Sequence, residues 1–289
     1  MIHCKNILVP IDFSTSSQDA ARYAQAMALS FGARITLLHV LAPIQFEFAL
    51  IPPQDDQLRG LLHERTTRTQ SELNRFLAME LSGCAVERTL AEGRADKEII
   101  ACARDSRADM IIMPTHGYGP LRRFLIGSVT AKVLDEAGLP VWTGVHFPKT
   151  QRSVLHLKSV LCALDLGPTS DKVLAFASGL SGKFSARLNL LHATAKQGEH
   201  AGDYSDPNWR VASANRIKVR MEELQAAAGT NAEVILESGS IQEVVAEAAQ
   251  RLEADTVIIG RSSPSDTFGR LRTHAYAIIR QSPCPVVSV

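Results

Sequence analysis

Residues 114–130 read PTHGYGPLRRFLIGSVT and contain residue types that can bind an anion. Gly117 stands early in this segment, and nine residues separate it from Gly127, which Ser128 follows directly. A glycine lets a phosphate approach the backbone closely. If a helix begins at Ser128, its first N–H groups point at the ligand and carry partial positive charge. The hydroxyls of Ser128 and Thr130, and the ring of His116, can add donors.

The same segment lacks the residues of the common catalytic nucleotide loops. No lysine follows its second glycine, so it is not a Walker loop, and no Gly-x-Gly-x-x-Gly run follows the first predicted strand. We find no acidic metal pair beside it and no convincing general base for water. Arg122 and Arg123 can supply charge or form a solvated loop. The pattern therefore favours binding over catalysis.

The elements that would position this loop follow a strand–helix alternation. Ser14 to Ser17 offer N-caps for a first helix that Gly32 ends, and Asp96 is expected to cap a later one. Alternation of this kind predicts an open α/β sheet covered on both faces. We expect strands at 6–11, 35–40, 86–91, 110–113 and 141–145, with further helices at 58–81 and 128–137.

Ligands of such sheets bind beyond the carboxyl ends of the strands, at the topological switch point. Asp12, Val40 and residues 114–117 all follow predicted strands, so we expect them to meet in one crevice. There Asp12 can accept hydrogen bonds from ribose hydroxyls or from an adenine amino group, although it can also act as a plain helix cap. Met113 is equally well placed to be core, and His116 to be an exposed loop residue.

The pattern is written twice along the 289 residues. Five segments recur in the same order, which chance does not produce. We therefore predict two copies of one domain, at 1–148 and 153–289, each an open five-stranded parallel sheet wound on both sides in Rossmann-like fashion. The matching pairs are 6–12 with 159–165, 33–40 with 186–193, 90–93 with 236–239, 108–113 with 254–259, and 139–142 with 284–287.

Composition narrows the class of protein. The chain has 31 basic and 30 acidic residues, which argues against a nucleic-acid partner. No run approaches about 18 apolar residues and the N-terminus lacks a signal-peptide core, so we expect no membrane span. The five cysteines are widely spaced, which is typical of reduced thiols in a cytoplasmic protein and does not suggest a zinc site.

At this point the residues resemble the universal stress proteins, whose nucleotide-binding members carry two glycines, nine residues, and a glycine followed by serine or threonine. Pro114, Gly117, Gly127, Ser128 and Asp12 stand at the matching positions, and the similarity spans both halves, as in tandem members. The resemblance implies the fold of that family and ATP as ligand, accompanied by Mg²⁺. The implied ligand contacts are Pro10, Ile11, Asp12 and Val40 on adenine and ribose, Met113, His116 and Gly117 on ribose and the first phosphate, and Gly127, Ser128, Val129 and Thr130 on the phosphates.

Both copies depart from the family pattern. Pro114 replaces the first glycine and has no N–H to donate, which would weaken binding by on the order of 1 kcal/mol without abolishing it. The second copy has Ser263 in place of a glycine, and Thr273 and His274 in place of the glycine–serine pair. We expect this degenerate loop to have lost its phosphate end, whereas Asp165 remains and leaves an adenosine-sized ligand open.

Three functional hypotheses follow. The first is a stress-response regulator or sensor that binds an adenine nucleotide in its first domain and hydrolyses ATP slowly or not at all. The second is an enzyme on a similar sheet, a slow ATPase or a nucleotidyl transferase, and the third is an interaction module that binds no nucleotide. Exposed edge strands invite pairing. Because members of the family that the chain resembles commonly pair through the last strand of each domain, the resemblance implies that the edges at 141–145 and 286–289 form an intramolecular pseudo-dimer. Two chains can associate further as a homodimer.

Overall fold

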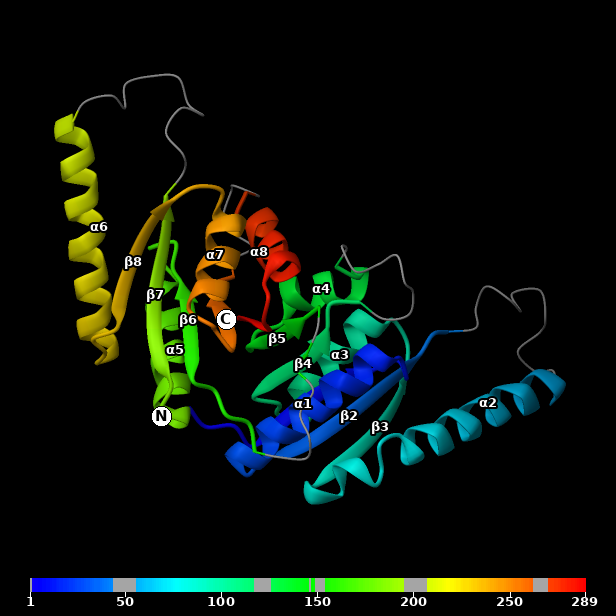
Figure 1. The fold of residues 1–289 in the computed structure, drawn as a ribbon. Helices are drawn as coiled ribbons and strands as arrows, with labels where there is room; N and C mark the ends of the chain where they lie inside the picture. The colour runs from blue at the N-terminus through cyan, green and yellow to red at the C-terminus, as the bar shows by residue number, and fades with distance from the viewer. Residues whose placement is uncertain are drawn as a thin grey trace.

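The computed structural model describes residues 2–43, 56–116, 126–145, 147–148, 154–194, 207–261 and 270–289. Its strands form one sheet in the order β3-β2-β1-β4-β5-β10-β9-β6-β7-β8 (Figure 1). The strands of the first half are β1 (Asn6–Ile11), β2 (Arg34–Leu41), β3 (Val86–Glu92), β4 (Met110–Pro114) and β5 (Val141–Gly144). Those of the second half are β6 (Ser159–Ala163), β7 (Arg187–Thr194), β8 (Glu233–Ser238), β9 (Thr256–Ile259) and β10 (Val286–Ser288).

Each half of the sheet is parallel, as the alternation predicts. In both halves the first strand lies between the second and the fourth, so the chain reverses its direction of travel across the sheet at that point. The halves join where β5 and β10 pair antiparallel, with Trp142 opposite Val287. The two segments named above as candidate edges thus pair with each other, and β3 and β8 are the outer strands.

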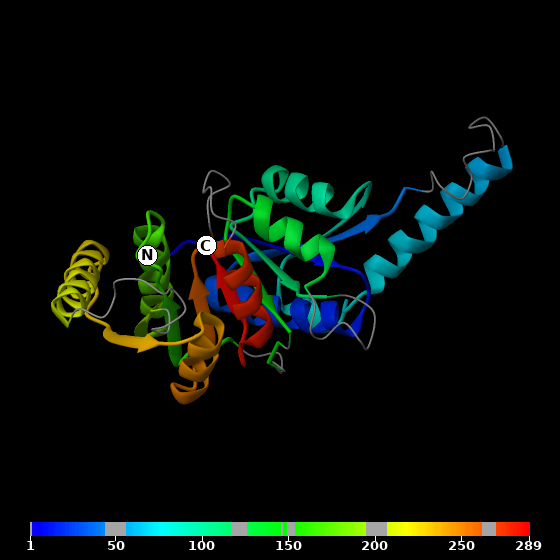
Figure 2. The same ribbon diagram turned by 90° about the horizontal axis from the view of Figure 1, so that it is seen from above.

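Helices cover both faces of the sheet (Figures 1 and 2). Side chains alternate along the strands, so Ile7 and Val9 enter one buried cluster and Leu8 enters the other. Both clusters continue across the two halves, which gives a doubly wound α/β fold. One cluster includes residues of α1 (Thr15–Phe31), of the last turn of α2 (Asp56–Arg75) and the segment that follows it, of α5 (Ser170–Phe184) and of α6 (Pro207–Ala228). The other cluster includes residues of α3 (Ala95–Asp105), α4 (Ser128–Glu136), α7 (Ile241–Arg251) and α8 (Arg270–Gln281).

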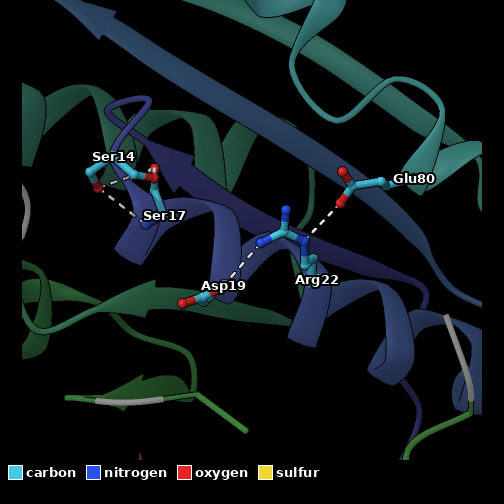
Figure 3. A network of polar contacts seen from close by, with 5 residues as sticks. All are labelled: Ser14, Ser17, Asp19, Arg22 and Glu80. Carbon is cyan, nitrogen blue, oxygen red and sulfur yellow. Dashed lines mark hydrogen bonds and ion pairs between the residues drawn. The ribbon is translucent and has the colours of Figure 1, made fainter. Parts of the chain in front are cut away.

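The first helix begins and ends where its sequence indicates. Ser14 is the N-cap of α1, and its Oγ accepts from the N–H of Ser17 at 3.2 Å. Gly32 ends the helix in the left-handed conformation, at φ 67°. Figure 3 shows how α1 is tied to the short 3-10 helix Glu80–Gly83, because Arg22 donates to Glu80 at 2.7 Å.

Two details differ from the sequence-based expectations. Asp96 does not cap α3, because the N-cap is Arg94 and Asp96 lies in the first helical turn, 2.8 Å from the Arg94 guanidinium. The helix expected to reach residue 81 ends at Arg75, since Leu77 takes a left-handed conformation, at φ 47°, that no helix can continue.

Candidate functional site

A cavity of about 240 Å³ lies at the carboxyl ends of the strands in the first half. It sits where β1 and β4 are neighbours and the strand order reverses, which is the expected position for a ligand in a doubly wound sheet. Ten of the eleven residues named from the sequence line it, together with six others. The described lining is Pro10, Ile11, Asp12, Ser17, Leu38, His39, Val40, Ala95, Ile99, Met113, Pro114, His116, Gly127, Ser128, Val129 and Thr130.

The N-terminus of α4 forms the polar end of this cavity. Gly127 is the N-cap residue and supplies no side-chain cap, and its own N–H donates to the carbonyl of Thr115 at 2.7 Å. The first helical bond runs from Ala131 back to Gly127. The N–H groups of Ser128, Val129 and Thr130 therefore have no acceptor within the helix, and none among the described residues. Three such donors at a helix start suit an anion.

The two hydroxyls at this end differ from each other. Ser128 is exposed at the cavity mouth. Thr130 is buried, and its Oγ1 donates to the carbonyl of Pro114 at 3.1 Å. In this structure that hydrogen holds α4 against β4, and donation from the Thr130 hydroxyl to a phosphate stays a prediction. The backbone N–H of Thr130 belongs to the first turn of α4 and has no acceptor within the helix.

Asp12 lies opposite α4, directly after β1. Its Oδ1 accepts from the backbone N–H of Ser14 at 3.0 Å and from the Ser14 hydroxyl. Asp12 therefore supports the helix cap rather than forming it. Within the described ranges Oδ2 has no protein partner, so one carboxylate oxygen can still accept from a ligand hydroxyl or amino group.

Pro114 takes a place in β4 where its missing N–H costs the sheet nothing. Thr115, one residue on, donates to Gly144 of β5 at 3.3 Å. Because successive N–H groups of a strand point to opposite sides, the Pro114 nitrogen faces β1. The β1–β4 ladder has already ended there, at Leu8 and Ile111. The proline nitrogen thus faces the crevice, where it removes a donor from the ligand side.

His116 and His39 are both fixed by neighbouring atoms. His116 is buried, with Nδ1 2.9 Å from the hydroxyl of Thr115. His39 is not among the residues named from the sequence, yet it lines the cavity, with Nδ1 2.8 Å from the carbonyl of Ile11 and its ring 4.4 Å from that of Phe13. Gly117, Arg122 and Arg123 lie outside the described residues.

The wall that α3 contributes to the cavity was not predicted from the sequence. Ala95 and Ile99 stand one turn apart on α3 and face the cavity. The spacing of Ile99 and Ala103 marks a buried helix face. This spacing could not show which end of the buried face lines the cavity.

A second cavity, of about 220 Å³, occupies the equivalent position in the second half. Asp165 stands at its rim and accepts from the N–H of Gly167 at 2.8 Å and from Ser170 at 3.1 Å, as Asp12 does from Ser14. His192 repeats the contact of His39, with Nδ1 2.8 Å from the carbonyl of Leu164. The described lining is Ala163, Leu164, Asp165, Leu191, His192, Ala193, Ile241, Val245, Ile259, Gly260, His274, Ala275 and Ile278.

Neither cavity holds a cluster of metal ligands. Over the described ranges, no group of three or more histidine, cysteine, aspartate or glutamate side chains could hold a metal ion. The same part of the chain has no helix long and apolar enough to cross a lipid bilayer.

This fold and this repeated cavity define a tandem, doubly wound α/β protein with a cavity at the strand ends of each half. The universal stress protein family model matches residues 3–143 and 156–289, and the chain belongs to that family. A universal stress protein of Thermus aquaticus is 33% identical over 138 residues, covering 47% of this chain and 96% of the relative. A second one, from Methanocaldococcus jannaschii, is 28% identical over 151 residues, 47% of this chain and 92% of its own.

Solved structures extend the likeness over both halves. The crystal structure of a universal stress protein from Archaeoglobus fulgidus covers 99% of this chain and 96% of its own, with a TM-score of 0.69 and 22% identity. At that identity the likeness shows the fold alone.

Proposed function

We propose that the first cavity binds ATP or a related adenine nucleotide, and that the protein acts as a nucleotide-dependent stress-response regulator or sensor. The single observation that carries the proposal is the uncapped start of α4, where the N–H groups of Ser128, Val129 and Thr130 meet an otherwise largely apolar cavity. Buried or half-buried donors of this kind need a partner, and a phosphate satisfies several at once.

The rest of the cavity suits the nucleoside part of the same ligand. Val40, Met113 and Ile99 provide apolar walls for a planar base. Asp12 stands across from α4 and keeps one carboxylate oxygen for ribose hydroxyls or the adenine amino group. Pro10 and Ile11 continue the wall at the end of β1, and His116 and Gly127 lie nearer the phosphate end.

We expect Mg²⁺ to arrive with the phosphates, because the described lining offers only Asp12 as an acidic ligand. The Ser128 hydroxyl is the one side-chain oxygen at the phosphate end, among the described residues, that is exposed and so could contact the ion or a phosphate. No described side chain is placed as a base for an attacking water, so turnover is expected to be slow or absent.

The domain boundaries 1–148 and 153–289, a cytoplasmic location and a homodimer stay predictions, as does the role of the β5–β10 contact as a pseudo-dimer interface.

A matched pair of cavity-filling variants tests the proposal. Val40 and Ala193 occupy the same register position at the ends of β2 and β7, and each lines its own cavity. Val40→Phe should abolish ATP binding measured by calorimetry with Mg²⁺, whereas Ala193→Phe should leave it unchanged. Thermal unfolding of both variants checks that the fold survives.

Two outcomes would overturn the proposal. Wild-type protein that binds no adenine nucleotide, and shows no shift in thermal midpoint with ATP and Mg²⁺, would favour the nucleotide-independent interaction module. Phosphate release well above background, lost in Val40→Phe, would instead favour the ATPase. Mass spectrometry of the freshly purified protein shows directly whether a nucleotide is carried along.

A further inference from the structure

The phosphate end of the second cavity is built differently from that of the first, and the reason is where the last helix begins. Met113 and Ile259 are the last residues of the matching segments 108–113 and 254–259. Ser128 and His274 are equivalent, since each follows that residue after the same number of positions. The helix α4 begins at Ser128, whereas α8 already begins at Arg270. At a rise of about 1.5 Å per residue, α8 is extended by about 6 Å, one full turn, at this end.

Because of that extra turn, the N–H groups that are free at the start of α4 have bonded counterparts in α8. In an α-helix the N–H of a residue bonds to the carbonyl four residues earlier. His274 and Ala275, which line the second cavity, therefore lie in the second turn of α8, and their N–H groups are used within the helix. The equivalent groups of Ser128 and Val129 are free of such bonds.

The cation that follows the cavity lining in the sequence does not compensate for this loss. Arg261 directly follows the cavity residue Gly260, but its guanidinium donates to the carbonyls of Leu134 at 3.3 Å and Leu139 at 2.7 Å, which belong to the first half. No lysine or arginine occurs among the described residues that line the second cavity. A phosphate placed at its inner end would therefore meet neither a free N–H group of His274 or Ala275 nor a lysine or arginine of the described lining.

The features that suit a base and a sugar are nevertheless retained. Ile241, Val245 and Ile259 form an apolar wall, and the cavity is nearly as large as the first, at about 220 Å³ against about 240 Å³. Asp165 is exposed at the rim, and both hydrogen bonds that it accepts from the described residues go to Oδ1. Its Oδ2 is left to accept from ligand hydroxyls.

We propose that the second cavity is a binding site for an uncharged nucleoside-like molecule, a planar heterocycle carrying a hydroxylated sugar, and that it discriminates against nucleotides. The apolar wall holds the heterocycle, Asp165 accepts from the sugar hydroxyls, and the α8 residues His274 and Ala275 offer the 5′ end no free helix N–H group. The two halves of one chain then recognise ligands that differ in phosphorylation. This inference stands whether or not the first cavity binds ATP.

Isoleucine methyl NMR on the wild-type protein tests both cavities in one spectrum, because Ile11 and Ile99 line the first and Ile241 and Ile259 the second. Adenosine is the probe, and ATP with Mg²⁺ is the comparison. Adenosine should shift the methyls of Ile241 and Ile259, and ATP should leave them in place at the same concentration. Any response of Ile11 and Ile99 to ATP reports on the first cavity separately.

Two variants show which cavity gives rise to the NMR shifts. Ala193→Phe should remove the adenosine shifts of Ile241 and Ile259, and Val40→Phe should retain them. Asp165→Asn keeps the acceptor for Gly167 but loses the charge, so we expect adenosine binding to weaken roughly tenfold. Methyls of Ile241 and Ile259 that ignore millimolar adenosine, or that respond to ATP at least as strongly, would overturn the proposal. Because the wild-type spectrum carries this result, it holds even if a variant fails to fold.

Discussion

Replacing Ser128 with proline would remove a backbone N–H and a hydroxyl that can donate to a phosphate, while leaving the helix intact. Ser128 is the first residue of α4, a position where proline is favoured because its N–H has no helical partner. The preceding Gly127 has φ -62° and ψ 146°, an extended conformation of the kind that a following proline requires. The substitution therefore costs the fold no hydrogen bond, and the smaller set of unfolded conformations should keep stability equal or slightly higher.

The effect on binding follows from the donors that the structure leaves open. Ser128 offers a backbone N–H and a hydroxyl, and Ser128→Pro removes both. A hydrogen bond to a charged group contributes about 1.5–3 kcal/mol, so loss of the N–H alone should weaken ATP binding by roughly 10- to 150-fold. Ser128→Ala removes only the hydroxyl and keeps the N–H, so its effect should be clearly smaller.

Calorimetric titration with ATP and Mg²⁺ at fixed salt measures this difference, and thermal unfolding reports on the fold. His274→Ala is the matched control, because it alters the equivalent position in the second half, where α8 has already used its N–H groups. ATP affinity unchanged in a stably folded Ser128→Pro protein would show that the α4 start does not contact the phosphates. The proposed binding mode would then be wrong, even if ATP still bound.

Two further predictions concern stability. Arg261→Met removes two of the hydrogen bonds that cross between the halves, so denaturant unfolding should show a loss of about 2 kcal/mol or more. Arg280→Met, at an exposed position on α8, should change the free energy of unfolding little, and equal effects of the two variants would refute the structural role of Arg261. Burial raises the pKa of the Cys284 thiol to about 11. The same thiol in the unfolded chain loses its proton at a lower pH, so the free energy of unfolding should fall between about pH 9 and 11. This thiol should contribute a fall of up to about 1.4 kcal/mol per pH unit. Cys284→Ala should flatten that fall, and an unchanged slope would contradict the raised pKa.

Local patterns in the sequence were enough to predict most elements and one cavity. Apolar runs bounded by glycine and hydroxyl residues indicated the strands and the cap and end of α1, because Ser14 and Gly32 act on backbone groups only a few residues away. Asp12 and Val40 could be placed at one edge because parallel strands share their carboxyl ends. The departures in the second loop were visible as substitutions, but their structural consequence was not.

Sequence by itself therefore determined the alternation of elements, the repeat and the residue types at the strand ends. Tertiary structure alone decided that β5 and β10 join the halves into one sheet, that the Thr130 hydroxyl holds Pro114, and that α8 starts a turn early. The physical reason is that these outcomes depend on which distant groups compete for the same donors, acceptors and apolar surfaces. A periodicity or a cap depends on neighbours along the chain. Which of two candidate acceptors a hydroxyl bonds to is decided only when the helix has packed on the sheet.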